Sequence, residues 1–352
     1  PGILGAVGEA IGDTTIAMKL LAGIGDVDSA LPSHSLWTMS RKIRASETLT
    51  AAFDAGLDDV LERLAADGSA DATDFLADWD AFIHEFGSRG PNEWDMYADS
   101  WETRPALPLA ALDRVRFQSD DESPQIRHDA VAAIREATTA EVRAKVADNE
   151  ELAGMVEAAL IASNMMAYRE RTKTNIVKVV HEGRMAMREL GRRHAEAGDI
   201  DDPQHVFMLL EGELDDFVAD PASFRGTLAQ RADEFAQLAE LEPPFIIEDG
   251  NVPPLSEWPR KDAVEADAAG AGEQLTGVPG SPGVVTGTAR VVLDPGDPFA
   301  LEPGDILVAP HTDPAWTPLF MTAGGVVVNV GGQISHAIIV SRELGLPCVV
   351  SA

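Results

Sequence analysis

Residues 326–340 read Val326-Val327-Val328-Asn329-Val330-Gly331-Gly332-Gln333-Ile334-Ser335-His336-Ala337-Ile338-Ile339-Val340. The first apolar run predicts a buried strand, and the second predicts a helix that opens close to His336. The two glycines between them allow a sharp turn and a close approach of the backbone to a ligand. The free N–H groups and the dipole of a first helical turn favour an anion. The stretch therefore predicts a strand-to-helix turn that places a histidine at an anion site.

His336 is the candidate catalytic residue of this turn. A neutral imidazole nitrogen is a good phosphoryl acceptor, and the positive end of a helix favours the neutral form. Gly331, Gly332 and Ser335 are the candidate phosphate-binding residues, because the glycines admit an anion and the hydroxyl can donate to it. The alternative is structural: a Gly-Gly turn joins a strand to a helix, and Ser335 and His336 form its N-cap pair.

The hydrophobic pattern changes once along the chain. From about residue 3 to residue 241, apolar residues recur at three- and four-residue spacing, which predicts helices. From residue 275 onward, Val/Gly/Thr strands alternate with short helices. We therefore predict a mainly α-helical domain at residues 1–241, a linker at 242–274 and a small α/β domain at 275–352. The chain stops directly after a hydrophobic run, so we expect the last domain to be incomplete at its C-terminus.

The predicted elements follow from the same pattern and from Pro and Gly punctuation. Helices are expected at Ser46–Ala65, Ala72–Phe86, Ile126–Ala147, Glu150–Ala197, His205–Val218, Pro221–Leu241, Pro314–Thr322 and Ser335–Leu344. Strands are expected at Gly283–Leu293, Ile306–Pro310, Val326–Asn329 and Cys348–Val350.

Composition excludes several classes of partner. The chain has 59 acidic and 27 basic side chains and a formal net charge of −32, so its field repels nucleic acid and anionic membrane surfaces. No apolar run approaches the roughly 20 residues that cross a bilayer, and the start lacks a signal-peptide pattern. The single cysteine, Cys348, excludes an internal disulfide framework and a multi-cysteine zinc site. We expect a cytoplasmic protein with no nucleic-acid or membrane partner and no metal site of its own.

Two cations interrupt an apolar pattern in the predicted helix Glu150–Ala197. Reading every third and fourth residue gives an apolar seam that is broken only by Arg169 and Lys173. Cations on a buried stripe are costly without an anionic partner, so this placement predicts a phosphate contact. The alternative is an internal salt bridge, for which Glu170 is available, or side chains that reach back to the solvent.

The loop Gly87–Asp95 is a further candidate for the site. It combines Arg89 with Glu93 and Asp95 in a Gly- and Pro-rich context, and one of these carboxylates can act as a general base toward a hydroxyl group. The alternative is that the loop is an ion-paired structural unit.

Several of these stretches resemble one enzyme family. Residues 331–347 resemble the phosphohistidine signature of the phosphoenolpyruvate-utilizing enzymes, which lies on their mobile, swivelling domain. Residues 280–291 and 304–320 resemble the same domain in the rifampin phosphotransferase branch. Residues 168–173 resemble the Arg-Glu-x-x-Lys stretch of that branch, and residues 87–95 resemble its Gly-x-Arg-x-x-x-Glu-x-Asp segment. The resemblance spans most of the chain.

The resemblance implies roles for these residues and a fold for each part. The last part is implied to be a β/β/α swivelling domain on which His336 is phosphorylated by ATP, or by phosphoenolpyruvate, bound on another domain. Arg169 and Lys173 are implied to stabilise the phosphoryl group during transfer. The helical part is implied to bind a small organic acceptor.

The resemblance therefore implies an ATP-dependent, dikinase-type phosphotransferase. The chain lacks a glycine-rich ATP-binding domain, so we expect ATP and Mg²⁺ on a missing N-terminal region or on a separate polypeptide. The chain alone is expected to bind no cofactor and to be inactive. Two alternatives stay open: a fragment similar to phosphoenolpyruvate synthase or pyruvate phosphate dikinase, and a non-catalytic phosphohistidine carrier module. A helical domain ahead of the histidine domain favours the branch that transfers from ATP to a small molecule.

Overall fold

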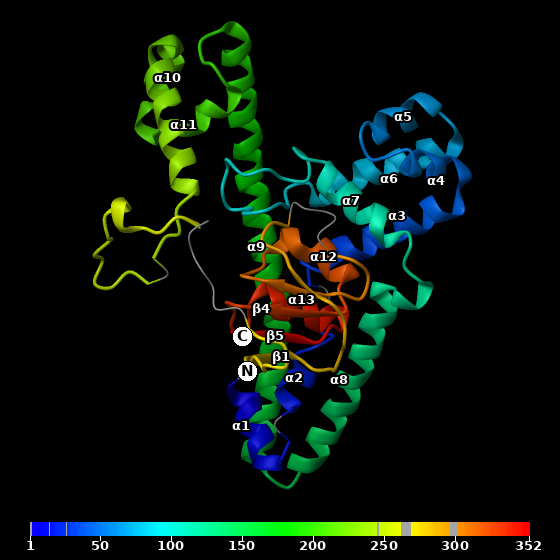
Figure 1. Ribbon diagram of the computed structural model, residues 1–352. Helices are drawn as coiled ribbons and strands as arrows, with labels where there is room; N and C mark the ends of the chain where they lie inside the picture. The colour runs from blue at the N-terminus through cyan, green and yellow to red at the C-terminus, as the bar shows by residue number, and fades with distance from the viewer. Residues whose placement is uncertain (1, 14, 26, 245, 262–268, 296–300) are drawn as a thin grey trace. The chain divides into compact units, whose positions relative to one another are not determined.

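A computed structural model describes residues 2–13, 15–25, 27–244, 246–261, 269–295 and 301–352 (Figure 1). The chain forms two compact units, Pro1–Val179 together with Thr276–Ala352, and Val180–Leu275. The predicted mainly helical part followed by a small α/β part is confirmed. The predicted linker at residues 242–274 stays a prediction, and residues 245 and 262–268 of it lie outside the described residues.

The helices of the first part largely follow the predicted pattern. They are α1 (Gly2–Ile11), α2 (Ile16–Leu20), α3 (Leu31–Ala45), α4 (Glu47–Asp54), α5 (Val60–Asp67), α6 (Ala70–Phe86), α7 (Ala106–Val115), η1 (Asp120–Glu122), α8 (Pro124–Val146) and α9 (Glu150–Ala197). The predicted bounds of α9 are confirmed, and those of α6 and α8 are correct to within two residues. The single helix predicted at Ser46–Ala65 is wrong, because Gly56 and Asp59 adopt left-handed backbone and divide it into α4 and α5.

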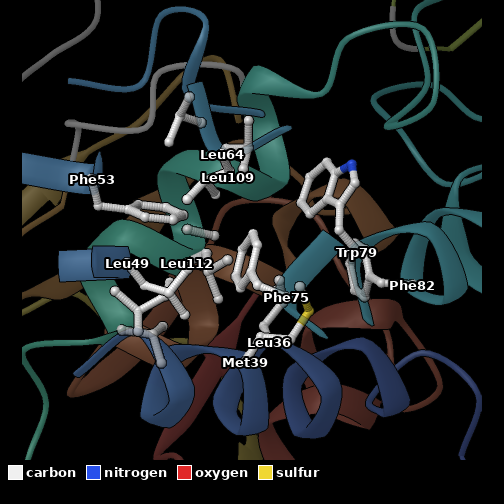
Figure 2. Packing of buried hydrophobic residues seen from close by; sticks show 14 of the residues in the cluster. Leu36, Met39, Leu49, Phe53, Leu64, Phe75, Trp79, Phe82, Leu109 and Leu112 are labelled. Carbon is white, nitrogen blue, oxygen red and sulfur yellow. The ribbon is translucent and has the colours of Figure 1, made fainter. Parts of the chain in front are cut away.

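Aromatic side chains hold α3 to α7 together (Figure 2). Phe75 of α6 meets Phe53 of α4 edge to face, and Phe82 stacks on Trp101 with 5.8 Å between the ring centroids. Rings of this kind bury large apolar areas and prefer such geometries. Because Trp101 belongs to the connection between α6 and α7, the core also fixes the loop that carries Arg89.

A second apolar cluster joins α1, α2, α8 and the first half of α9. Its fully buried members include Leu20, Val142 and Val156. In the part of the chain that the structure describes, no helix combines the length and the apolarity that a membrane span requires.

The second unit has a small core around Ile200, Val206 and Phe217. Its elements after α9 are η2 (Pro203–Met208), η3 (Glu211–Glu213), α10 (Leu214–Ala219), η4 (Pro221–Phe224), α11 (Arg225–Ala239) and η5 (Leu255–Glu257). The helix predicted at His205–Val218 is therefore wrong. The backbone is extended at Leu209 and Leu210, which ends the first helical turns before α10 begins.

The C-terminal part is a five-stranded sheet in the order β1-β5-β4-β3-β2. Its elements are β1 (Val278–Ser281), β2 (Ala289–Val291), β3 (Ile306–Ala309), η7 (Pro314–Trp316), α12 (Thr317–Thr322), β4 (Gly325–Val328), α13 (His336–Leu344) and β5 (Cys348–Val350). Strands β2 to β5 are parallel, and β1 pairs antiparallel with β5. The strands predicted at β3, β4 and β5 are confirmed, the one predicted at Gly283–Leu293 is shorter, and β1 was not predicted.

Strand β4 delivers the chain to the start of α13. Its Val-rich run is mostly buried, as is typical of a parallel strand covered on both faces. The connection that follows lies at the carboxyl end of the sheet, where ligands bind in α/β folds. Helix α13 ends at Gly345, whose φ of 65° is the left-handed conformation of a helix C-cap.

Candidate functional site

His336 is the first residue of α13 and is half-buried. Its Nδ1 atom lies 3.2 Å from Thr312 Oγ1, and its Nε2 atom lies 3.5 Å from Thr317 Oγ1. The Phe320 ring meets the imidazole edge to face, with 5.7 Å between the ring centroids. Two hydroxyls and a ring therefore orient the imidazole from the segment between β3 and β4.

Burial is the main cause that lowers the pKa of His336 well below its ordinary value, and the charges of Lys173 and Arg89 lower it further. The imidazole is therefore neutral at neutral pH, which is the form with a nucleophilic nitrogen. The sequence predicted this neutral form from a helix end. In the structure, the causes are burial and the charges of Lys173 and Arg89, two cations that are distant in the sequence.

The turn before His336 differs in detail from the prediction. Ser335 occupies the N-cap position, but its side chain does not cap the helix, and its buried Oγ atom has no partner among the described residues. An added Cβ at Gly331 would lie 3.0 Å from Val350 Cβ, whereas Gly332 has open space around it. Neither glycine has a positive φ. Gly331 is thus explained by close packing, and Ser335 keeps an unused hydroxyl beside His336.

The predicted apolar seam of α9 is wrong by one position around the two cations, although Ala159 and Leu190, nearer its ends, do pack against apolar cores. The buried residues of this stretch are Ser163, Glu170, Thr174 and Val177, whereas Arg169 is half exposed. A polar stripe is buried here because its members find partners on other elements, so hydrophobic periodicity pointed to the neighbouring face. The two cations therefore flank the buried stripe and do not interrupt it.

Both cations have carboxylate partners. Lys173 Nζ lies 3.0 Å from Glu93 Oε1, and Arg169 Nη1 lies 2.7 Å from Glu170 Oε1. Glu170 also accepts a hydrogen bond of 2.6 Å from Ser29 Oγ. The backbone carbonyl of Ser29 in turn accepts from Thr317 Oγ1 at 3.2 Å, so a chain of contacts connects the His336 surroundings with α9.

Arg89 and Glu93 form a buried ion pair, with 3.2 Å between Nη1 and Oε2. Arg89 Nη2 also donates to Thr174 Oγ1 at 2.7 Å, which fastens the loop to α9. These contacts match the structural alternative for the loop, and they also set Glu93 against Lys173. Asp95 shapes the following turn, where it accepts hydrogen bonds from Asn92 and from the Tyr97 N–H.

Glycines permit the close path of this loop. An added Cβ at Gly90 would lie 2.3 Å from Asp99 O, and one at Gly87 would lie 2.4 Å from Ile83 O. The backbone pairs there, since Trp101 N donates to Arg89 O at 2.7 Å. The loop therefore needs glycine at positions 87 and 90 to hold Arg89 in this place.

Asp313 connects the same loop to the C-terminal part. Its carboxylate accepts from Asn92 N at 3.0 Å and from Ala315 N at 2.9 Å. Burial raises the pKa of Asp313, and the charge of Glu93 raises it too. Sequence reasoning did not single out Asp313, Thr312 or Thr317, because no periodic signal marks lone polar residues between a strand and a helix.

His336 opens on a cavity of about 440 Å³. Its lining includes Ser335 and Ile334 next to His336, and Trp94, Arg169 and Lys173 from the loop and α9. A second cavity, of about 360 Å³, has a mainly apolar lining that includes Leu4, Leu21, Val27, Ala159 and Met166. Ile334 lines both cavities. The structure thus brings four of the predicted site residues, His336, Ser335, Arg169 and Lys173, to one space.

Comparison with known proteins finds a family match in each part of the chain. Residues 2–170 match the model of the rifampicin phosphotransferase fourth domain, and residues 301–352 match the model of the PEP-utilising enzyme mobile domain. The chain is similar to the rifampicin phosphotransferases in the first of these segments and to PEP-utilising enzymes in the second. Arg169 falls within the first match, and His336 falls within the second. The resemblance predicted from the sequence is confirmed.

Curated relatives are similar to most of this chain. A rifampicin phosphotransferase of Streptomyces sviceus is 32% identical over 307 residues, which are 83% of this chain and 33% of the relative. An uncharacterised protein of Mycobacterium tuberculosis is 33% identical over 341 residues, 95% of this chain and 36% of the relative. The prodigiosin synthesizing transferase PigC of Serratia marcescens is 30% identical over 288 residues, 78% of this chain and 30% of the relative. The chain spans about a third of the length of these relatives.

Proposed function

We propose that this chain is the phosphohistidine and acceptor-binding portion of an ATP-dependent phosphotransferase. Relatives named rifampicin phosphotransferase support phosphotransfer as the class of reaction. The observation that carries the proposal is a neutral, partly buried His336 that opens on a cavity lined by Lys173 and Arg169. Such a site offers a nucleophile and two cationic side chains, each with a carboxylate partner, to contact one phosphoryl group.

In the first step, the unprotonated ring nitrogen of His336 attacks a phosphorus atom of ATP. An N–P bond forms while the bond from that phosphorus to the bridging oxygen breaks, and the departing nucleotide keeps the electron pair on this oxygen. ATP and Mg²⁺ are assigned to a domain or partner outside this chain. In the described residues, no group of three or more His, Cys, Asp or Glu side chains is arranged to hold a metal ion.

In the second step, a hydroxyl oxygen of the acceptor attacks the same phosphorus. An O–P bond forms, the N–P bond breaks with its electron pair returning to His336, and the hydroxyl proton passes to a base. Lys173 and Arg169 stabilise the charge of the transferring group, and the unused Ser335 hydroxyl can donate to it. The base is proposed to be Glu93 or Asp95; Glu93 contacts Lys173, which lines the cavity, but does not line the cavity itself.

The acceptor is proposed to carry a hydroxyl group on a largely apolar body. The apolar cavity beside the His336 cavity supports this, because such cavities bind ligands mainly through buried apolar surface. Rifampicin, which names several relatives, is the first acceptor to test.

The test is to follow label from ATP in the complete enzyme, or with the polypeptide that supplies the nucleotide site. Label is expected on His336 as an acid-labile, base-stable adduct, and His336→Gln abolishes it because glutamine has no nucleophilic ring nitrogen. His311→Gln is the matched control, since His311 is an exposed histidine of the same part of the chain. Label that persists in His336→Gln, or that survives acid, contradicts the proposal. Full transfer after Arg169 and Lys173 are both neutralised favours the carrier-module alternative.

A further inference from the structure

Glu343 lies near the end of α13 that is remote from His336, and it is buried. Its Oε1 atom accepts a hydrogen bond from Ile24 N at 3.0 Å, and its Oε2 atom accepts one from Gly25 N at 3.1 Å. His128 Nδ1 of α8 lies 3.4 Å from the same Oε2 atom. One carboxylate of the C-terminal part thus binds three groups of the helical part.

A buried carboxylate is costly unless hydrogen bonds replace its lost hydration. For Glu343, the hydrogen-bond donors in the described part of the chain come from Ile24, Gly25 and His128. The carboxylate is therefore satisfied by groups far away in the sequence and not by its own segment. If α13 moved away from residues 24–25, the carboxylate would lose these donors.

Other contacts link the same two parts, but they join neutral groups or lie nearer the surface. Gln118 Nε2 donates to Met321 O at 2.8 Å, and Thr317 Oγ1 donates to Ser29 O at 3.2 Å. Hydrogen bonds to an ionised acceptor are roughly twice as strong as neutral ones. Glu343 therefore accepts two charge-assisted hydrogen bonds from the helical part at once.

The end of α13 also lies directly on α8. An added Cβ at Gly345 would lie 3.0 Å from Val131 Cγ2. From His336 to Glu343 a helix rises about 11 Å at 1.5 Å per residue. A short helix of this kind is stiff, so a clamp at Glu343 determines where His336 stands.

We propose that Glu343 is a positioning residue: it holds α13 on residues 24–25 and His128, and thereby keeps His336 at the cavity lined by Lys173. The contact of α13 with residues 24–25 and His128 does not depend on the reaction. Its importance for phosphoryl transfer rests on the proposed function.

The experiment compares Glu343→Ala and Glu343→Gln with Asp305→Asn in the 352-residue chain. Asp305 is a matched control, because it is buried in the same part of the chain and accepts from Arg290 Nε at 2.9 Å and from Glu302 N at 3.1 Å, both within that part. Two readouts are used: the titration of His336 by NMR, assigned by its loss in His336→Gln, and the amide exchange of Ile24 and Gly25.

Glu343→Ala is expected to move the pKa of His336 up toward its ordinary value, because the imidazole leaves its buried place beside Lys173. Exchange of the Ile24 and Gly25 amides should rise about tenfold to a hundredfold, the range for losing a charged hydrogen-bond acceptor. Glu343→Gln should give an intermediate result, since the amide group can accept from one N–H but repels the other. Asp305→Asn should change neither readout.

The proposal is overturned if Glu343→Ala leaves both the His336 titration and the two amide exchange rates unchanged. If Glu343→Ala does not fold, Glu343→Gln decides, because its size is nearly that of the native side chain. Neither readout requires ATP or an acceptor. Failure of the docking is therefore distinguishable from failure of the phosphohistidine function, which is tested by labelling alone.

Discussion

Lys173 and Glu93 form an ion pair with 3.0 Å between Nζ and Oε1, and Arg89 holds the other oxygen of the same carboxylate at 3.2 Å. Arg89 and Glu93 are almost fully buried, whereas Lys173 reaches the cavity in front of His336. Of the two partners of this carboxylate, Arg89 stabilises the buried loop, and Lys173 faces the proposed path of the phosphoryl group. Predictions for the two cations differ accordingly.

Lys173→Met should slow phosphoryl transfer from His336 by roughly 10²- to 10³-fold, the usual effect of removing one group that stabilises transition-state charge. The pKa of His336 should rise, because the charge of Lys173 is one of its lowering causes, but it should stay below the ordinary value since burial persists. The rate at which label leaves His336 measures the transfer, and NMR titration of His336 measures its pKa.

The control for Lys173→Met is Arg192→Ala, which removes a cation of the same helix that is paired with Glu189 and Glu196. It should leave transfer unchanged. If Lys173→Met lowers the free energy of unfolding by about 3–5 kcal/mol while transfer is unaffected, the pair with Glu93 is purely structural.

Arg89→Ala should lower the free energy of unfolding by about 3–5 kcal/mol, because it leaves the buried Glu93 without its buried partner. Lys42→Ala removes the partner of Asp78 in a much more exposed pair and should cost at most about 1 kcal/mol. Urea unfolding of both variants measures the difference. If both variants lose equally little free energy of unfolding, the ion pair with Lys173 is enough to stabilise the buried charge of Glu93.

Gly90→Ala and Gly154→Ala should change stability in opposite directions. An added methyl at Gly90 would overlap the backbone of Asp99, so the loop must shift at a cost of roughly 1–3 kcal/mol. Gly154 lies inside α9 with open space around it, and alanine there should stabilise by about 0.5–1 kcal/mol. Thermal and urea unfolding measure both values. A neutral Gly90→Ala would mean that the loop is not held as described.

Docking of α13 should depend on pH through His128. The hydrogen bond to Glu343 raises the pKa of His128, and the charge of Asp129 contributes. A histidine with a raised pKa stabilises the folded state fully below its ordinary pKa, near 6.5, and this contribution is lost as the pH rises through the raised value. Burial and the charge of His128 lower the pKa of nearby His34. As the pH falls, protonation of His34 therefore destabilises the folded state, whereas protonation of His128 stabilises it.

The measurement is the free energy of unfolding of the native protein relative to His128→Asn. The native protein should lose its advantage as the pH rises above about 6.5, and the advantage should be smaller in Glu343→Gln, where only the charge of Asp129 still raises the pKa of His128. An advantage that grows with pH would have the wrong sign for the pair.

Local signals made the strand-to-helix turn at His336 predictable from the sequence. The Val-rich run, the double glycine and the apolar run after them marked β4 and α13, and thereby placed His336 at the first turn of a helix. These features act within a few residues of the chain. Strand β1 escaped prediction because its sequence, Val278-Pro279-Gly280-Ser281, has low strand propensity and depends on pairing with β5.

The buried face of α9 was not predictable from periodicity. Glu170 and Thr174 are buried because Ser29 and Arg89 supply their hydrogen bonds from distant parts of the chain. A hydrophobicity pattern cannot register such partners. The same reason explains why the lowered pKa of His336 was attributed to the helix end alone, since Lys173 comes close to it only through tertiary folding.

Ile334 borders both the cavity of His336 and the apolar cavity beside it. On the proposed function, a bound acceptor would rest its apolar body on one side of this isoleucine and its reactive oxygen on the other. The width of the Ile334 side chain then sets the distance between the apolar part of the acceptor and its reactive oxygen. Selection among acceptors would depend on the distance between the hydroxyl group and the apolar part of the molecule. Compounds of very different shape would be accepted if this distance is the same.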